Sequence, residues 1–142
     1  MSTTPPERLG PTVTPDTQFF WDGLRERRLL IQRCDGCGVL RHPPRPMCPQ
    51  CHSLEWHEQR LAGTGTLYSY AVLHHPRSPL FDFPVLAALV DLDEGVRVMT
   101  NLVAVEAAGI RIGMRLTVGF EATSDGGTVP VFRPALHRDA PA

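Results

Sequence analysis

The sequence predicts a mainly β protein in which an N-terminal helix and a metal-binding ribbon precede a five-stranded OB-fold barrel. Three observations support this prediction: an apolar stripe at helical spacing, four cysteines in two C-x-x-C pairs, and an apolar period of two beyond Gly63. The 142 residues are enough for one domain or two very small ones. We expect an arm at residues 1–15, the helix and ribbon at 16–60, the barrel at 61–135 and a tail at 136–142.

The helix is expected over residues 16–28. Phe20, Trp21 and Leu24 are spaced three and four residues apart, so they form one apolar face. Thr14 precedes this stretch and is expected to cap it, because a threonine oxygen can accept hydrogen bonds from the first free N–H groups. Residues 29–33 form a short apolar run that leads into the cysteines, and residues 54–60 are expected to form a return strand.

The second half of the chain predicts the barrel. A D-E-G turn and a D-G-G turn are typical of hairpins between the second and third strands and between the last two. No long helix separates the strands, which excludes a three-layer parallel sheet and favours the OB fold. The expected strands are 66–74, 85–91, 96–105, 116–122 and 128–133.

The cysteines are the strongest functional signal. Cys34, Cys37, Cys48 and Cys51 form two C-x-x-C pairs separated by ten residues. This spacing lets four thiolates converge on a tetrahedral ion, and four thiolates leave no open position at which the ion could activate water. The sequence therefore predicts a structural zinc site. Iron uses the same ligands and stays open as an alternative.

Other residues of the ribbon have expected roles. Gly36 and Gly38 are expected to supply the positive φ angles that tight metal-binding turns need. His42, His52 and His57 could each replace a cysteine ligand, but the four cysteines make this unnecessary, and we expect these histidines on the surface.

Composition and charge exclude several classes of protein. The formal net charge is −1, whereas a protein that binds nucleic acid through phosphates usually carries excess positive charge. An OB-fold module for single-stranded nucleic acid stays as an alternative, because Tyr68, Tyr70 and Phe120 could stack on bases. The basic side chains are all arginine, which excludes a lysine Schiff base.

The chain shows no sign of export or membrane insertion. No apolar stretch reaches the roughly 18 residues of a membrane span, and residues 1–10 lack the features of a secretory signal. We therefore expect a cytoplasmic protein without a membrane partner, in which disulfides are disfavoured.

The sequence offers no catalytic constellation. Ser69 and Ser78 lack a G-x-S-x-G elbow, and the cysteines are assigned to metal. His74 and His75 are the best acid–base candidates, although a structural or ligand-contacting role is favoured. Acidic residues around the first hairpin could hold a divalent ion, but such turns are usually only solvated; they are Asp91, Asp93 and Glu94.

The ordered set of motifs resembles a known family. It comprises F-W-D-G-L-R-E-R-R-L-L-I-Q-R-C-D-G-C-G (20–38), G-T-G-T-L-Y-S-Y-A-V-L-H-H-P (63–76), V-M-T-N-L-V (98–103), I-G-M-R-L-T-V (112–118) and V-P-V-F-R-P-A (129–135). Together these are similar to the family catalogued as domain of unknown function number thirty-five. The resemblance covers nearly the whole chain and implies a helix, a rubredoxin-like zinc ribbon and an OB fold.

The resemblance also implies a role beside acyl-CoA enzymes. Family members are accessory subunits or fused domains of thiolase-fold enzymes, including acyl-CoA thiolases, acyltransferases and thiolase-like aldolases that cleave steroid side-chain CoA thioesters. The implied role is a non-catalytic subunit of a hetero-oligomer. The arginine-only composition suits a GC-rich genome and favours the aldolase. The chain is then either a free subunit or an excised domain.

Contacts to acyl-CoA or to the partner follow from this implication. Arginines would bind the phosphates of CoA, and an apolar groove would take its chain. The candidates are His74, His75, Arg77, Phe81, Phe83 and Arg133, with Leu80 beside the two phenylalanines.

Overall fold

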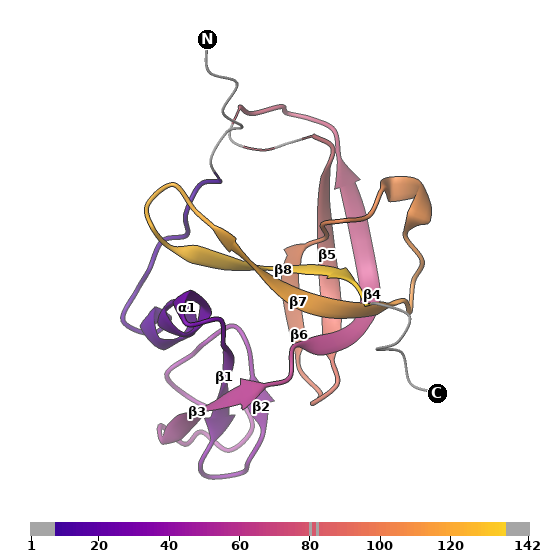
Figure 1. Ribbon diagram of the computed structural model, residues 1–142. Helices are drawn as coiled ribbons and strands as arrows, with labels where there is room; N and C mark the ends of the chain where they lie inside the picture. Colours follow the sequence, from indigo (N-terminus) through magenta and orange to yellow (C-terminus); the bar gives the residue numbers. More distant parts are fainter. Residues whose placement is uncertain (1–7, 80, 82, 136–142) are drawn as a thin grey trace.

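The structure, a computed structural model, describes residues 8–79, 81 and 83–135, and it places the helix and ribbon at one end of a barrel (Figure 1). Leu80, the first half of the expected arm and the expected tail lie outside the described residues. Within the described residues, no helix has the length and apolar character needed to cross a membrane. The elements are α1 (Gln18–Arg25), β1 (Leu29–Cys34), β2 (Leu40–Arg41), β3 (Trp56–Leu61), β4 (Thr64–Leu73), β5 (Val85–Leu92), β6 (Arg97–Asn101), η1 (Ala107–Gly109), β7 (Arg115–Ala122) and β8 (Thr128–Pro134).

The helix α1 is shorter than the sequence predicts. Its N-cap is Thr17 and not Thr14, because the N–H of Thr17 donates to the carbonyl of Thr14 at 3.0 Å and closes a turn before the helix. The predicted apolar face is confirmed. Phe20 is buried, and Leu24 is fully buried. The helix therefore covers the junction between ribbon and barrel with one apolar side.

The ribbon is a three-stranded antiparallel sheet in the order β2-β1-β3. β1 is the central strand and is buried along almost its whole length, which agrees with its apolar sequence. β2 has only two residues, which is too short for an alternating apolar pattern to be recognised in the sequence. The ribbon buries few side chains for its size, so its loops need another source of stability.

The barrel is a nearly closed five-stranded antiparallel sheet in the order β6-β5-β4-β7-β8. Leu102 closes it by a parallel bridge to Phe132, and the N–H of Val103 donates to the Phe132 carbonyl at 2.9 Å. The predicted strand 96–105 therefore ends at Asn101, because the chain leaves β5 there and turns toward β8. The OB-fold prediction is confirmed, with Phe132 and Leu116 fully buried in its core.

Ribbon and barrel are joined by two residues, Ala62 and Gly63. Gly63 has a φ of +81°, and a Cβ at this position would lie 2.3 Å from Cγ1 of Val118. The N–H of Val118 also donates to the Gly63 carbonyl at 2.8 Å. Only glycine fits a left-handed backbone this close to a neighbouring strand, so the corner between the two units is fixed sterically.

The acidic turn between β5 and β6 is a structural clamp. Asp93 accepts hydrogen bonds from Arg115 at 2.7 Å and from Thr64 at 2.8 Å. Glu94 accepts one from the N–H of Ala62 at 2.9 Å. These carboxylates bind cationic and neutral donors of three different strands or loops, so the turn ties β4 to β7.

The clamp predicts a pH-dependent stability. The hydrogen bonds from Arg115 and then Thr64 lower the pKa of Asp93 to about 2. A lowered carboxyl pKa stabilises the fold above the unfolded value of about 3.9, and this contribution is lost as pH falls toward 2. Asp93→Asn should therefore lower the melting temperature at pH 6 and show a weaker loss between pH 4 and pH 2 than the wild type. Identical melting curves for the two proteins across this range would contradict the clamp.

Candidate metal centre

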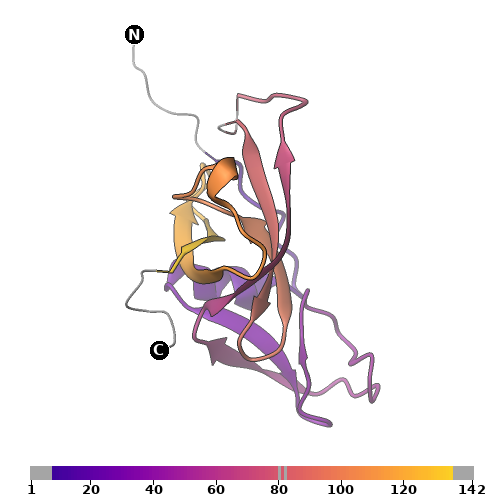
Figure 2. The ribbon, with the colours of Figure 1, turned by 90° about the vertical axis from the view of Figure 1, so that its right-hand side faces the viewer.

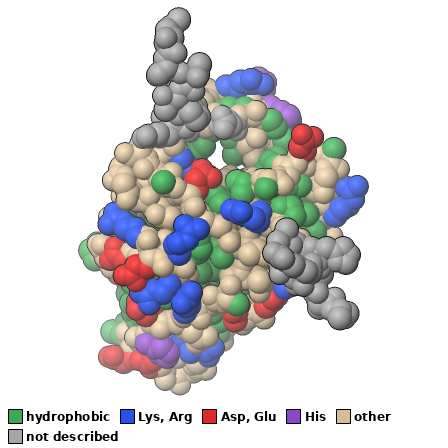
Figure 3. Space-filling view, viewed as in Figure 1, with side chains coloured by type: hydrophobic (Ala, Val, Ile, Leu, Met, Phe, Trp, Pro, Cys, Tyr) green, Lys and Arg blue, Asp and Glu red, His purple; other side chains and the backbone are tan. Residues whose placement is uncertain are grey.

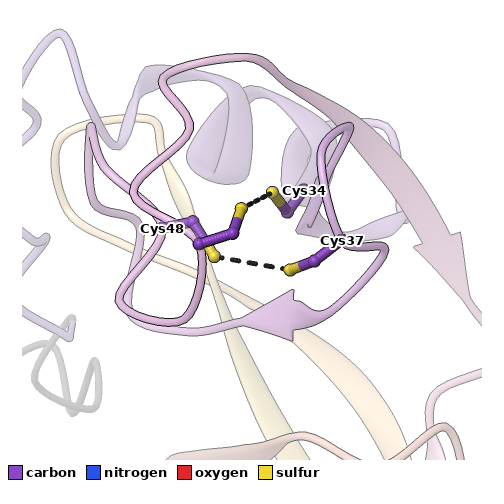
Figure 4. A group of neighbouring side chains, drawn as sticks. Cys34, Cys37 and Cys48 are labelled. Atoms are coloured by element: carbon purple, nitrogen blue, oxygen red, sulfur yellow. Dashed lines mark hydrogen bonds between the residues drawn. The ribbon is translucent and has the colours of Figure 1, made fainter.

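Four cysteine sulfurs converge between the ends of the ribbon strands. The Sγ atoms of Cys34, Cys37, Cys48 and Cys51 all lie within 4.8 Å of one another. Two of the separations are 3.5 Å, from Cys34 to Cys51, and 3.7 Å, from Cys37 to Cys48 (Figure 4). A zinc ion at about 2.3 Å from each of four sulfurs places them about 3.8 Å apart. A disulfide needs about 2 Å. The cluster thus has the dimensions of a metal site and not of two disulfides.

The two C-x-x-C segments adopt the same turn. The N–H of Gly38 donates to the carbonyl of Cys34 at 2.9 Å, and the N–H of His52 donates to that of Cys48 at 2.9 Å. Gly38 has a φ of +78° and His52 one of +65°. The positive φ predicted for Gly38 is confirmed. The second turn puts a histidine in the same left-handed conformation, which costs roughly 1–2 kcal/mol more than glycine.

Gly36 is needed for a different reason from the one predicted. Its φ is not positive; a Cβ at this position would lie 3.0 Å from the Sγ of Cys51. Its backbone N–H donates to the Sγ of Cys34 at 3.3 Å. Glycine therefore leaves space for a sulfur of the opposite turn while its amide stabilises a thiolate.

Backbone amides and neighbouring sulfurs shift the pKa values of the cysteines in opposite directions. The backbone N–H of Cys37 is the main cause that lowers the pKa of Cys34 to about 6. At Cys51 the N–H of Ser53 acts in the same direction, but the adjacent sulfur of Cys34 contributes to a pKa raised to about 11. One thiolate makes a second one harder to form, and a cation bound between the sulfurs removes this conflict.

The ribbon histidines stay outside the sulfur cluster. His52 and His57 are exposed as predicted, and His57 Nδ1 lies 2.5 Å from a carboxylate oxygen of Asp35. The surface prediction is wrong for His42, which is half-buried with its ring centroid 5.0 Å from that of Phe20. Burial lowers the pKa of His42 to about 4, so this imidazole is neutral at pH 7 and acts as a packing residue.

The loop between the two turns is held by a buried amide that the sequence did not reveal. Gln32 of β1 is 1% exposed; its Nε2 donates to the Arg45 carbonyl at 3.1 Å and its Oε1 accepts from the Arg45 N–H at 2.8 Å. The buried guanidinium of Arg41 donates to the same carbonyl at 2.9 Å. Gln32 lies inside an otherwise apolar run, and this position could have indicated a buried hydrogen-bonding role, because a buried amide needs partners.

The other predicted contact residues do not form one site. His74, His75, Arg77 and Arg133 are exposed, and Arg133 lies against Gly119 of β7 and not at the β4–β5 loop. The two phenylalanines of that loop, Phe81 and Phe83, are half-buried.

Arginines cover both phenylalanines. Arg77 lies 5.9 Å above the Phe83 ring, and Arg8 lies 5.9 Å above the Phe81 ring. Phe81 lines a hollow of about 450 Å³ between the barrel, α1 and the ribbon. Arg8 also hydrogen-bonds Asn101 and fastens the N-terminal segment to the barrel; nothing in the sequence predicted this role.

Comparison with known proteins supports the two-part architecture. Residues 21–57 match the family model described as "ChsH2, rubredoxin-like zinc ribbon domain", and residues 58–121 match "ChsH2, C-terminal OB-fold domain". The fold and the cysteine cluster therefore define a zinc-ribbon and OB-fold protein. The chain belongs to the DUF35 family, as the resemblance of its motifs indicated.

Two similar proteins are longer than this chain, which matches only part of each. A "Probable enoyl-CoA hydratase alpha subunit" of Thermomonospora curvata is 45% identical over 93% of this chain, and a "3-oxo-4,17-pregnadiene-20-carboxyl-CoA hydratase alpha subunit" of Mycobacterium tuberculosis is 40% identical over 78%. The chain spans 41% and 35% of their lengths. A "DUF35 domain-containing scaffold protein" of Methanocaldococcus jannaschii is 33% identical, and the match covers 75% of this chain and 78% of that protein.

Solved structures show the same fold. A chain of the solved "Ltp2-ChsH2(DUF35) aldolase" is 46% identical, with a TM-score of 0.85; the match covers 89% of this chain and all of the other. A DUF35 protein of unknown function from Sulfolobus solfataricus shares the fold at 15% identity, with a TM-score of 0.59 and 87% of each chain covered.

The buried amide of the ribbon predicts a specific loss of stability. Gln32→Leu keeps the volume and removes both hydrogen bonds to Arg45, which leaves the Arg45 N–H without its partner, whereas the Arg45 carbonyl keeps the hydrogen bonds from Arg41. We expect about 1–3 kcal/mol of destabilisation in chemical unfolding. Gln59→Leu on the adjacent strand β3 is the comparison variant; its half-buried side chain accepts one hydrogen bond, from Arg33, and its loss should have a smaller effect. Equal losses for both variants would show that Gln32 has no special role.

Proposed function

We propose that the chain is a non-catalytic accessory subunit or domain of a thiolase-fold acyl-CoA enzyme. The observation that carries this proposal is the match, at 46% identity and a TM-score of 0.85, to a chain of the solved Ltp2-ChsH2 aldolase. A closed four-sulfur cluster also uses every cysteine of the chain, so none is left as a nucleophile. The chain then contributes a scaffold, and the partner contributes the chemistry.

The scaffold is proposed to hold one structural zinc ion through Cys34, Cys37, Cys48 and Cys51. Support comes from the mutual sulfur distances and from the match to a zinc-ribbon family model. Zinc bound by four thiolates would have no free position for a substrate. The unpaired state of the cysteines also supports the proposal of a reducing, cytoplasmic compartment.

The proposed reaction of the partner is retro-aldol cleavage of a steroid side-chain CoA thioester. Support comes from the names of two similar proteins, the Ltp2-ChsH2 aldolase and the pregnadiene-carboxyl-CoA hydratase subunit of Mycobacterium tuberculosis. A thiolase or acyltransferase partner is the alternative. The archaeal relatives are named as scaffold proteins, which agrees with an accessory role beside either kind of enzyme.

A direct contact to acyl-CoA is a further part of the proposal. The exposed guanidiniums of Arg77 and Arg133 could each pair with a phosphate of CoA. They lie on different parts of the barrel, so a single CoA would use one of them together with residues of the partner. His74 and His75, exposed at the end of β4, stay candidates for the same contact.

The nucleic-acid alternative has less support. Arg97 lies 3.5 Å above the Tyr68 ring, and Arg27 lies 5.2 Å above that of Phe120, so these rings are not free to stack on bases. Basic and acidic side chains are intermixed over the helix and ribbon (Figure 3). Such a surface lacks the continuous positive groove that tracks a nucleic-acid backbone.

The zinc proposal predicts coupled loss of metal and structure. Cys37→Ser should reduce bound zinc well below one ion per chain and unfold the ribbon, because structural zinc contributes on the order of 10–16 kcal/mol in small zinc peptides. Metal analysis and circular dichroism measure the two effects. His57→Ala, which changes an exposed ribbon residue outside the sulfur cluster, should keep the zinc. A fully metallated and folded Cys37→Ser protein would contradict the proposal.

The accessory role is tested by reconstitution with the Ltp2 chain of the solved complex. We expect the two chains to elute together in size-exclusion chromatography and to cleave a steroid side-chain CoA thioester, whereas this chain alone has no activity. Arg133→Ala and Arg77→Ala report on CoA contact through an increased KM at unchanged kcat. Turnover by the isolated chain, or failure of the two chains to associate, would overturn the proposal.

A further inference from the structure

The strand β4 has an edge that no other described strand covers. β7 pairs only with Thr64–Thr66, and Leu67 exchanges backbone hydrogen bonds with Met114 at 3.0 Å and Gly113 at 2.8 Å. From residue 68 to residue 73, β4 pairs with β5 on one side, and the described residues offer no backbone partner on the other. The upper halves of β4 and β5 extend beyond the rest of the barrel as a two-stranded hairpin (Figure 2).

The register identifies the backbone groups at this edge. The carbonyl of Leu86 accepts from the N–H of Leu102 at 2.9 Å, so it faces β6 and not β4. Val72 is opposite Leu86, and residues of an antiparallel pair face the same way with respect to their partners. Val72, and Tyr70 two residues before it, therefore direct their N–H and C=O groups away from β5.

The side chains along this edge give it no protection. The run L-Y-S-Y-A-V-L from residue 67 to residue 73 has no charge, proline or glycine. Tyr70 is 38% exposed and Leu73 is 41% exposed. Natural edge strands normally carry charges, prolines or bulges that prevent pairing with another chain. A bulge does occur at this strand, but it lies between Leu67 and Ser69, at the start of the open part, and residues 70–73 continue in regular register.

The outer face beside the edge is also apolar. Ala71 and Ala87 pair across β4 and β5, and Met99 of β6 is 75% exposed next to them. These small residues leave a shallow hollow of about 200 Å³ that Tyr70 also lines. A strand that joined the edge would continue this face and place its side chains beside Ala71, at the β4 side of the hollow.

We propose that an extended segment of the partner enzyme subunit adds to β4 at residues 68–73 as a further β-strand. The N–H and C=O groups of Tyr70 and Val72 are directed outward at strand spacing, and another main chain supplies donors and acceptors at the same spacing. The uncharged run of β4 favours an uncharged segment, with apolar side chains placed beside Ala71 on the outer face. This inference rests on the proposed accessory function, because the same partner supplies the strand.

Amide hydrogen exchange tests the pairing directly. The probe is the Ltp2 chain of the solved complex, mixed with the full chain of this protein. Peptides that contain residues 68–73 should exchange at least about tenfold more slowly in the complex. Unchanged exchange in a formed complex would overturn the inference and leave the accessory role intact.

Two variants give an independent test. Tyr70→Pro removes an outward N–H at a position where edge strands tolerate proline, and Ala71→Lys introduces a charge of the kind that blocks edge pairing. Each should weaken binding of Ltp2 at least about tenfold in calorimetry, with melting temperature and zinc content close to those of the wild type. Leu54→Lys, at a ribbon residue that is 62% exposed, is the matched control and should bind normally.

The outcomes separate the two proposals. Wild-type affinity in the folded Ala71→Lys variant would overturn the edge assignment alone. A homodimer of the isolated chain that Ala71→Lys dissociates would show that a second copy, and not the enzyme, occupies the edge. If the wild type does not bind Ltp2 at all, the accessory role and the edge assignment fail together.

Discussion

The convergence of four cysteine sulfurs is the constraint on which the rest of the ribbon depends. A three-stranded sheet that includes a two-residue strand buries too little apolar surface to fix its own loops. The sulfurs bring together two identical turns, and Gly36 permits their approach because it has no side chain. β1, which follows α1, and β3, which leads into β4, are paired with each other, and the cluster fixes the loops at their ends. The barrel receives its N-terminal neighbour in a defined position as a result.

The sequence predicted those parts of the structure that local chemistry determines. C-x-x-C spacing and the D-E-G and D-G-G turns each act within a few residues, so the four-sulfur cluster and the two hairpins could be foreseen. Long-range contacts could not. Strand β6 ends early because Leu102 pairs with Phe132, and His42 is buried because Phe20 lies against it. The roles of Gln32 and Arg8 depend on contacts with distant residues in the same way.

Some strand edges of the barrel are closed by pairing or side-chain contacts, whereas one edge of β4 is left open. At β6 and β8 the edges meet through a parallel bridge, and at the acidic turn Asp93 ties β4 to β7. The upper half of β4 has neither device. A fold that closes its edges elsewhere and leaves one uncharged strand open concentrates its capacity for association in one place. Under the proposed strand addition, the residues that bind the partner are different from those that close the barrel.

The corner at Gly63 has a mechanical consequence. Ribbon and barrel match separate family models, yet the two residues between them include a glycine that is clamped against Val118. Such a joint has no slack, unlike a flexible linker, whose ends diffuse independently. A force applied to the ribbon would be transmitted to β4 through this corner. The protein would thus present ribbon and barrel to another molecule as one rigid unit. The angle between them is set by Gly63, which has no side chain.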